Sequence, residues 1–256
     1  MSRFPPNPRP EEVHLLRTYT RRLEATVAAL VIDREKPSRR LVKAIRPVRK
    51  AAGKVRDMDV LIGEAMTLPD HQVSEAAIRL VEHLAKMRVK NARKLRGVIR
   101  ARGEDARRLL KQSSKLIRKR LKDDSPAVDG EAAPQILTTE LSHWPDLDAG
   151  NLHLFRIRIK ELRYMLQLGQ EADETLVEAL GEVKDSIGEW HDWVELLKIA
   201  QKVLDPGSDY EVLKHIGDTG NQKFAHALSI ASRVRGRYFS GPDPRIVNKR
   251  VLQMAS

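Results

Sequence analysis

Cysteine is absent from this chain, and aromatic residues make up only 4% of its 256 residues. Without cysteine, disulfides, zinc thiolates and thiol nucleophiles are excluded. The scarcity of aromatic rings leaves few platforms on which nucleic-acid bases can stack. No apolar run approaches the roughly 20 residues that a membrane-spanning helix needs, and the N-terminus lacks the apolar stretch of a signal peptide. We therefore expect a cytoplasmic protein with no membrane partner.

Basic residues, in contrast, are abundant. The chain has 47 Lys and Arg against 35 Asp and Glu, which gives a formal net charge of +12 and a pI near 10.0. A charge of this size says little about the fold, but it indicates a polyanionic partner and fast association with it. The hydrophobic content of 41% is enough for a substantial core, and the length allows one large domain or two of ordinary size.

A pattern of cations occurs twice in the chain. The pattern His-x-x-Arg-x-x-x-(Arg/Lys)-x-Leu begins at His14 and again at His153, an offset of 139 residues. Each copy is followed by a second segment in which a glycine, Gly53 or Gly188, stands three residues before an Arg or a His, at an offset of 135. A duplicated core alone would repeat apolar residues. Because the cations are repeated, the duplication has preserved a basic surface as well as a fold.

Apolar residues recur at three-four spacing through both copies, which is typical of amphipathic helices. In the first segment they are Val13, Leu16, Leu23, Val27 and Leu30, with Thr20 filling one position, and the second copy keeps this register with Leu152, Phe155, Ile159, Leu162 and Leu166. The second segments repeat in the same way, with Leu41, Ile45, Val48, Ala52, Val55 and Ile62 matching Leu176, Leu180, Val183, Ile187, Trp190 and Leu197. We call each such row of apolar residues a seam. Residues 71–102, about 104–122 and about 210–238 are also helical in character, and no segment alternates with period two for long enough to be a strand. The sequence therefore predicts an all-α fold of two antiparallel helical bundles related by an internal pseudo-twofold duplication.

A linker separates the two predicted halves. Residues 123–134 contain two prolines, one glycine and four acidic residues, a composition that breaks helices. We predict a first half over residues 1–122, a linker over 123–135 and a second half over 136–256.

The cations of both copies lie at one angular position beside the predicted apolar seams. On the first helix each follows a seam residue directly, which places it about 100° round from the buried face. The first copy contributes His14, Arg17 and Arg21 on one helix and Arg46, Arg49, Gly53 and Arg56 on the next; the second copy contributes His153, Arg156 and Lys160, then Lys184, Gly188 and His191. Four such stripes can line one shared groove. A glycine in mid-helix costs roughly 1 kcal/mol relative to alanine, so we expect both glycines to permit close approach of a helix or a ligand.

Each of these features also has a purely structural interpretation. A single basic stripe is usually a solvated helix face, and His14 and His153 can be boundary histidines bonded to a carboxylate. Repetition on four helices favours binding. Asp57 and Asp192 are better explained as structural partners that orient an Arg or a His. Asp59 lies on the apolar seam, where it requires a buried donor.

The stretch from Lys86 to Lys122 holds sixteen basic residues and two acidic ones. Long charge runs on helices are most often solvated surfaces. A second anion-binding surface and a nucleic-acid patch are the alternatives, and the cations occur on several faces at once, so they cannot all reach one ligand.

The paired motifs, duplicated across about 250 helical residues, resemble the conserved histidine α-helical domain, or CHAD, family. Residues 55–61 (VRDMDVL) and 152–164 (LHLFRIRIKELRY) are close to that family's pattern. The resemblance implies a pair of four-helix bundles, together one CHAD domain, with a strongly basic central surface that binds inorganic polyphosphate. Glu24 and Glu161 stand where the family often has a basic residue, and Gln167 replaces a frequent glutamate.

We therefore expect a non-enzymatic protein that binds inorganic polyphosphate in a basic groove or channel lined by helices of both halves, with no cofactor and no bound metal. Polyphosphate granules are a further candidate partner and location. The residues expected to bind polyphosphate are His14, Arg17, Arg21, Arg22, Arg46, Arg49, Lys50, Arg56, His153, Arg156, Lys160, Arg163, Lys184 and His191.

Two other functions compete with this expectation. A basic helical protein can bind nucleic acid, although the chain carries no recognised nucleic-acid motif. A metal-dependent phosphohydrolase is suggested by the adjacent His191 and Asp192. That activity needs several neutral His and carboxylate ligands around the metal, whereas these histidines stand among cations that repel a divalent ion.

Overall fold

The computed structural model describes residues 4–29, 36–69, 74–122, 132–167 and 173–239. Within these ranges it contains seven α-helices and no strand, so the all-α prediction is confirmed for the described chain. The helices are α1 (Pro10–Ala29), α2 (Lys36–Ala65), α3 (Glu75–Lys122), α4 (Ala132–Ser142), α5 (Leu152–Leu166), α6 (Glu174–Val203) and α7 (Tyr210–Tyr238). None of the described helices is long and apolar enough to cross a membrane. The pseudo-twofold relation between two bundles stays a prediction.

The chain forms two compact units. Unit 1 consists of Met1–Asp129 and Asp192–Thr219, and unit 2 consists of Gly130–His191 and Gly220–Ser256. Each unit contains two stretches of chain, because the boundaries fall inside α6 and inside α7. The division into halves at residues 122 and 136 stays a prediction. Of the predicted linker, residues 123–131 lie outside the described residues, and 132–135 begin α4.

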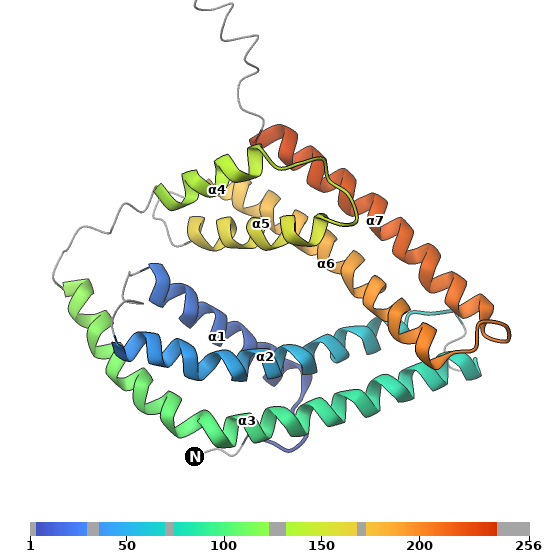
Figure 1. The fold of residues 1–256 in the computed structure, drawn as a ribbon, viewed down its shortest axis with the longest axis horizontal. Helices are drawn as coiled ribbons and strands as arrows, with labels where there is room; N and C mark the ends of the chain where they lie inside the picture. Colours follow the sequence, from blue (N-terminus) through green and yellow to red (C-terminus); the bar gives the residue numbers. More distant parts are fainter. Residues whose placement is uncertain (1–3, 30–35, 70–73, 123–131, 168–172, 240–256) are drawn as a thin grey trace, which may run out of the picture. The chain divides into compact units, whose positions relative to one another are not determined.

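In unit 1, α3 is a single helix of 48 residues where the sequence pattern predicts two. The predicted break near Gly103 does not occur, because a lone glycine costs only about 1 kcal/mol relative to alanine and α3 contains no proline. Residues 71–73, also predicted to be helical, lie outside the described residues. α3 packs along α2, and α2 also packs against α1 (Figure 1).

The buried faces follow the predicted apolar seams. Val13 of α1 packs with Val48, Ala52 and Val55 of α2 against two buried residues of α3 in unit 1. In unit 2 the seam of α5 is equally buried, at Leu152, Phe155, Ile159 and Leu162, as is the seam of α6 at Leu180, Val183, Ile187 and Trp190. Leu30, the last predicted seam residue of the first helix, lies outside the described residues.

The sequence pattern does not predict α4. This helix has only 11 residues, too few for a clear period, and it begins beside Pro134, which is typical of a linker. It packs against α5 in unit 2 and buries Leu137 and Leu141. Trp144, just after α4, meets Phe155 edge to face with ring centroids 5.6 Å apart. Tertiary packing therefore stabilises a helix that its own sequence signals weakly.

Asp59 lies on the buried face of α2, and its side chain is only 4% exposed. Arg88 of α3 donates a hydrogen bond from Nε to Oδ1 of Asp59 at 2.5 Å. The same guanidinium donates to the side-chain oxygen of Asn7 at 2.8 Å and to the carbonyl oxygen of Pro8 at 2.7 Å. Arg88 is thus the buried donor that the seam position of Asp59 requires, and it joins the N-terminal segment to α2 and α3.

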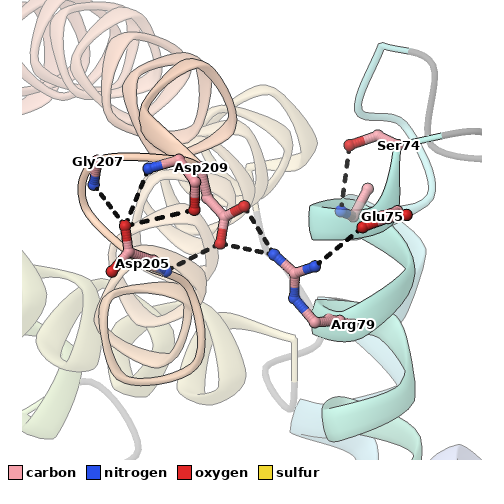
Figure 2. A network of polar contacts seen from close by, with 8 residues as sticks. Ser74, Glu75, Arg79, Asp205, Gly207 and Asp209 are labelled. Atoms are coloured by element: carbon pink, nitrogen blue, oxygen red, sulfur yellow. Dashed lines mark hydrogen bonds and ion pairs between the residues drawn. The ribbon is translucent and has the colours of Figure 1, made fainter.

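A second polar network joins the start of α3 to the turn between α6 and α7 within unit 1 (Figure 2). Nη2 of Arg79 donates to both carboxylate oxygens of Asp209 at 2.7 Å. The carboxylate also accepts the backbone N–H of Asp205 at 2.8 Å. These hydrogen bonds, the one from Arg79 first, hold the pKa of Asp209 below the ordinary aspartate value.

We expect Arg79→Ala to lower the melting temperature at neutral pH and to make the melting temperature less dependent on pH in the acid range. Because the folded-state pKa of Asp209 is depressed, its stabilisation is present above the unfolded pKa of about 3.9 and is lost as the pH falls through the folded pKa. The difference between the melting temperatures of wild type and variant should therefore begin to shrink at about pH 4 and disappear below the folded-state pKa of Asp209. Thermal unfolding followed by circular dichroism between pH 2 and 7 measures this.

The control for Arg79→Ala is Arg108→Ala, which removes an exposed ion pair with Asp105 on the same helix. Its melting profile should run parallel to that of the wild type. A constant gap between wild type and Arg79→Ala down to the lowest pH would contradict the role given to the Asp209 carboxylate.

Candidate functional site

Three arginines from two helices of unit 1 act electrostatically on one carboxylate, that of Asp57. Arg17 and Arg21 come from α1, and Arg56 comes from α2 beside Asp57. Although Asp57 as a residue is exposed, desolvation of its carboxyl group raises its pKa, while Arg17, Arg21 and Arg56 act in the opposite direction. We call Arg17, Arg21, Arg56 and Asp57 cluster 1. The two predicted stripes of the first copy therefore come near each other at Asp57. The orienting role of Asp57 stays a prediction.

The glycine on α2 lies beside one of these arginines. A Cβ placed on Gly53 would come within 3.8 Å of Nε of Arg17, which is an ordinary contact distance. The helices thus approach closely at this point, but an alanine would still fit.

Arg49 of α2 is engaged by a carboxylate in the structure. Its Nε lies 2.8 Å from Oε2 of Glu24 on α1, and both side chains are about three-quarters buried. The sequence singles out Glu24 only as a departure from the family pattern and does not pair it with Arg49. The signal available in the sequence is that Glu24 stands 139 residues before Arg163, so that an acid in one copy replaces a base in the other.

In unit 2 the equivalent stripes of α5 and α6 also meet. Nε of Arg156 donates to the carbonyl oxygen of Lys184 at 2.9 Å. The rings of His153 and His191 lie with centroids 4.4 Å apart, at 39° to each other. We call Arg156, Lys184, His153 and His191 cluster 2. The Lys184 ammonium also lies 2.6 Å from the carboxylate of Asp185.

Gly188 is required for this arrangement. A Cβ at that position would lie 2.5 Å from Nη2 of Arg156, closer than real contacts allow. Arg163, further along α5, makes the same kind of contact with α6. Its Nε donates to the carbonyl oxygen of Val177 at 3.2 Å, and a Cβ on Gly181 would lie 3.4 Å from that nitrogen. The expectation that a stripe glycine permits close approach is therefore confirmed for Gly188, and the approaching group is a guanidinium.

The other predicted site residues differ in exposure. Four of them are exposed and have no ion pair with a carboxylate in the described part of the chain: His14, Arg22, Arg46 and Lys50. Lys160 is half-buried on α5. All fourteen residues remain predicted polyphosphate ligands. The structure groups some of them into clusters 1 and 2.

We expect Gly188→Ala to displace the Arg156 side chain at little cost in stability. The new methyl group would meet the far end of a flexible side chain, which can move, and alanine favours the helix by about 1 kcal/mol. The Nε–H resonance of Arg156 should therefore shift in nitrogen-correlated NMR spectra while the melting temperature stays equal or rises. Gly53→Ala is the matched control, because its Cβ fits beside Arg17. An unchanged Arg156 resonance in the Gly188 variant would contradict the steric argument.

Acidic and imidazole side chains do not gather around a common point. Among the described residues there is no group of three or more His, Asp or Glu side chains placed to hold a metal ion.

A second basic surface covers α3 in unit 1. Its exposed cations include Lys86, Lys90, Arg93, Lys94, Arg96, Arg100, Arg102, Arg107, Arg108, Lys111, Lys115, Arg118 and Lys119. Within the described chain only Lys86, with Glu82, and Arg108, with Asp105, form ion pairs among these. A solvated surface, a second anion-binding surface and a nucleic-acid patch all remain open for this helix.

Comparison with known families identifies the domain. The family model of the CHAD domain matches residues 6–201, well over half of the chain. The chain belongs to the CHAD family. The match includes α1 to α5 and most of α6, so both clusters of this CHAD domain lie inside it. Neither a curated protein nor a solved structure matches the chain.

Proposed function

We propose that this CHAD domain binds inorganic polyphosphate, without catalysing a reaction, through clusters 1 and 2. Cluster 1 carries the proposal: Arg17 of α1 lies against Gly53 of α2, so basic stripes from two helices come together, and Arg17, Arg21 and Arg56 all act on the Asp57 carboxylate. Membership of the CHAD family is consistent with a polyphosphate-related function. Polyphosphate granules are the accompanying partner and location in this proposal.

Polyphosphate suits such a surface for physical reasons. The polymer carries about one negative charge per phosphate and is flexible, so it needs several dispersed donors more than a shaped pocket. Arginine presents five N–H donors in a planar fork that matches phosphate oxygens. Each desolvated charge-assisted contact contributes about 1.5 to 3 kcal/mol, so four or five such contacts give tight binding even after the ordering of the polymer is subtracted.

The charge around the histidines supports binding over hydrolysis. The rings of His153 and His191 lie 4.4 Å apart, and Arg156 stands one helical turn after His153 on α5, so a divalent cation at this histidine pair would meet like charge nearby. A neutral or protonated imidazole, in contrast, can donate a hydrogen bond to a phosphate oxygen.

Nucleic-acid binding is the second candidate, and the exposed cations of α3 favour it. Contacts to a phosphate backbone need no aromatic platform, only Lys and Arg along a surface. Duplex nucleic acid is therefore the form that this surface fits better, since the chain has few rings for unstacked bases.

A competition assay tests the proposal. Labelled long-chain polyphosphate is bound to the full chain at physiological salt and displaced by unlabelled polyphosphate, duplex DNA, RNA and short phosphates at matched charge. We expect unlabelled polyphosphate to displace the probe at concentrations at least about tenfold lower than nucleic acid, a difference of about 1.4 kcal/mol. Displacement by nucleic acid at equal charge would favour the second candidate instead.

A further inference from the structure

We infer that the polyphosphate affinity of this CHAD domain resides mainly in unit 1 and that unit 2 provides a weaker site. This inference rests on the proposed function and names which of the two duplicated clusters dominates it. The sequence repeat alone suggests two equal half-sites, because each copy repeats the histidine and the arginine of the motif.

The formal charge is divided very unequally between the units. Unit 1 contains 35 Lys and Arg against 22 Asp and Glu, a net charge of +13. Unit 2 contains 12 Lys and Arg against 13 Asp and Glu, a net charge of −1, and the two values together give the +12 of the whole chain. The field that attracts a polyanion therefore originates in unit 1.

Equivalent positions of the two copies show the same imbalance locally. At the offsets of 139 and 135, four of the predicted site cations of unit 1 are replaced in unit 2 by an acid, a glycine or a histidine. The exchanges are Arg22 for Glu161, Arg46 for Gly181, Lys50 for Asp185 and Arg56 for His191. Duplication has thus kept the framework of the second site while removing much of its charge.

The contacts of the remaining unit 2 cations reduce what they can offer a ligand. Lys184 lies 2.6 Å from the Asp185 carboxylate, and Nε of Arg156 and of Arg163 is bonded to backbone carbonyl oxygens. In unit 1, by comparison, no carboxylate of the described chain lies within ion-pair distance of Arg21, Arg22, Arg46, Lys50 or Arg56. Arg22, Arg46 and Lys50 therefore keep their donors for a ligand, and Arg21 and Arg56 interact with the Asp57 carboxylate only at longer range.

Among the predicted site positions, one pair runs in the opposite direction. Glu24 of unit 1 engages Arg49, whereas its counterpart in unit 2 is Arg163. Glu24 thus takes one cation from the unit 1 site, but the four opposing exchanges outweigh it. The net difference still favours unit 1.

The experiment compares two charge-matched pairs of substitutions at equivalent positions in the full chain. Arg17→Gln with Arg21→Gln removes two cations from unit 1, and Arg156→Gln with Lys160→Gln removes two from unit 2. Lys202→Gln with Lys214→Gln removes two cations of unit 1 outside cluster 1 and controls for net charge. Affinity for long-chain polyphosphate is measured for each at several salt concentrations.

We expect the unit 1 pair to lower affinity by at least about 30-fold, the unit 2 pair by less than about fivefold and the control by less than about twofold. The slope of log affinity against log salt should fall most in the unit 1 pair, because fewer counterions are released. If the Arg156 variant fails to fold, the single variants Arg21→Gln and Lys160→Gln carry the same comparison.

An equal or larger fall in affinity in the unit 2 pair would overturn the inference while leaving the proposed function intact. A fall in the control as large as that in the unit 1 pair would also overturn it, because net charge and not cluster 1 would then decide affinity. A wild-type chain that does not bind polyphosphate overturns the proposed function itself, so the two failures are distinguishable.

Discussion

Replacing Arg17 and Arg156 together with alanine should abolish most polyphosphate binding and leave the helical content unchanged. Each side chain is the arginine of the repeated motif, and each lies against the glycine of the neighbouring helix, Gly53 or Gly188. The Arg17 contact to phosphate, at about 1.5 to 3 kcal/mol, corresponds to a fall in affinity of about 10- to 150-fold, and loss of Arg156 from the weaker site adds less than about fivefold. Fluorescence anisotropy with labelled polyphosphate measures the affinity, and far-ultraviolet circular dichroism measures the helical content.

The matched control for this double substitution is Arg93→Ala with Arg100→Ala, which removes two exposed cations from α3 and none from either cluster. It should retain affinity within a few-fold of the wild type, since loss of exposed charge acts only through the screened long-range field. Unaltered affinity in the Arg17 and Arg156 variant would remove the clusters from the binding model. A fall in the control as large as that in the variant would move the binding surface to α3.

Replacing Arg88 with alanine should destabilise unit 1 by about 3 to 5 kcal/mol. The substitution leaves the Asp59 carboxylate, only 4% exposed, without the guanidinium that donates to it. It also removes the donors to the Asn7 side chain and the Pro8 carbonyl, which hold the N-terminal segment against α3. Urea unfolding followed by circular dichroism measures the destabilisation.

A second variant separates the buried charge from the change in packing. Arg88→Met combined with Asp59→Leu removes both charges and keeps most of the volume, so it should be much more stable than Arg88→Ala. If the two variants were equally destabilised, the cost would lie in packing and in the N-terminal hydrogen bonds, and the unpaired carboxylate would not be its source.

Periodicity predicted the helices and their buried faces well, because both depend on residues close together in the sequence. Val13, Ala52 and Val55 are buried where three-four spacing places them. Asp59 on the seam required a donor for the same local reason, although the sequence did not say that Arg88 would provide it. The short helix α4 and the unbroken course of α3 were not predictable in this way, because packing against α5 and α2 stabilises segments whose own signals are weak or interrupted.

The candidate site was predicted in part. The repeat singled out Arg17 and Arg156 together with the glycines that they approach. A glycine in mid-helix destabilises the helix, so its presence at the same place in both copies predicted a close approach there. The ion pair between Glu24 and Arg49 was not predicted, because it depends on the rotation of one helix against another. The ion pair of Lys184 with Asp185 is local, yet spacing alone did not show which way either side chain turns.

The sequence by itself determined that the chain is helical, that a basic motif is duplicated in it and that it belongs with the CHAD domains. These properties depend on the order of residues within single helices and on motifs repeated at fixed offsets along the chain. Only the tertiary structure decided which cations converge and which are held by a carboxylate or a backbone carbonyl. It also decided that α6 and α7 divide between the units, so that all of the excess positive charge lies in unit 1. The physical reason is that such charges act through space over several ångströms, and the distances between helices are set by side-chain packing and not by spacing along the chain.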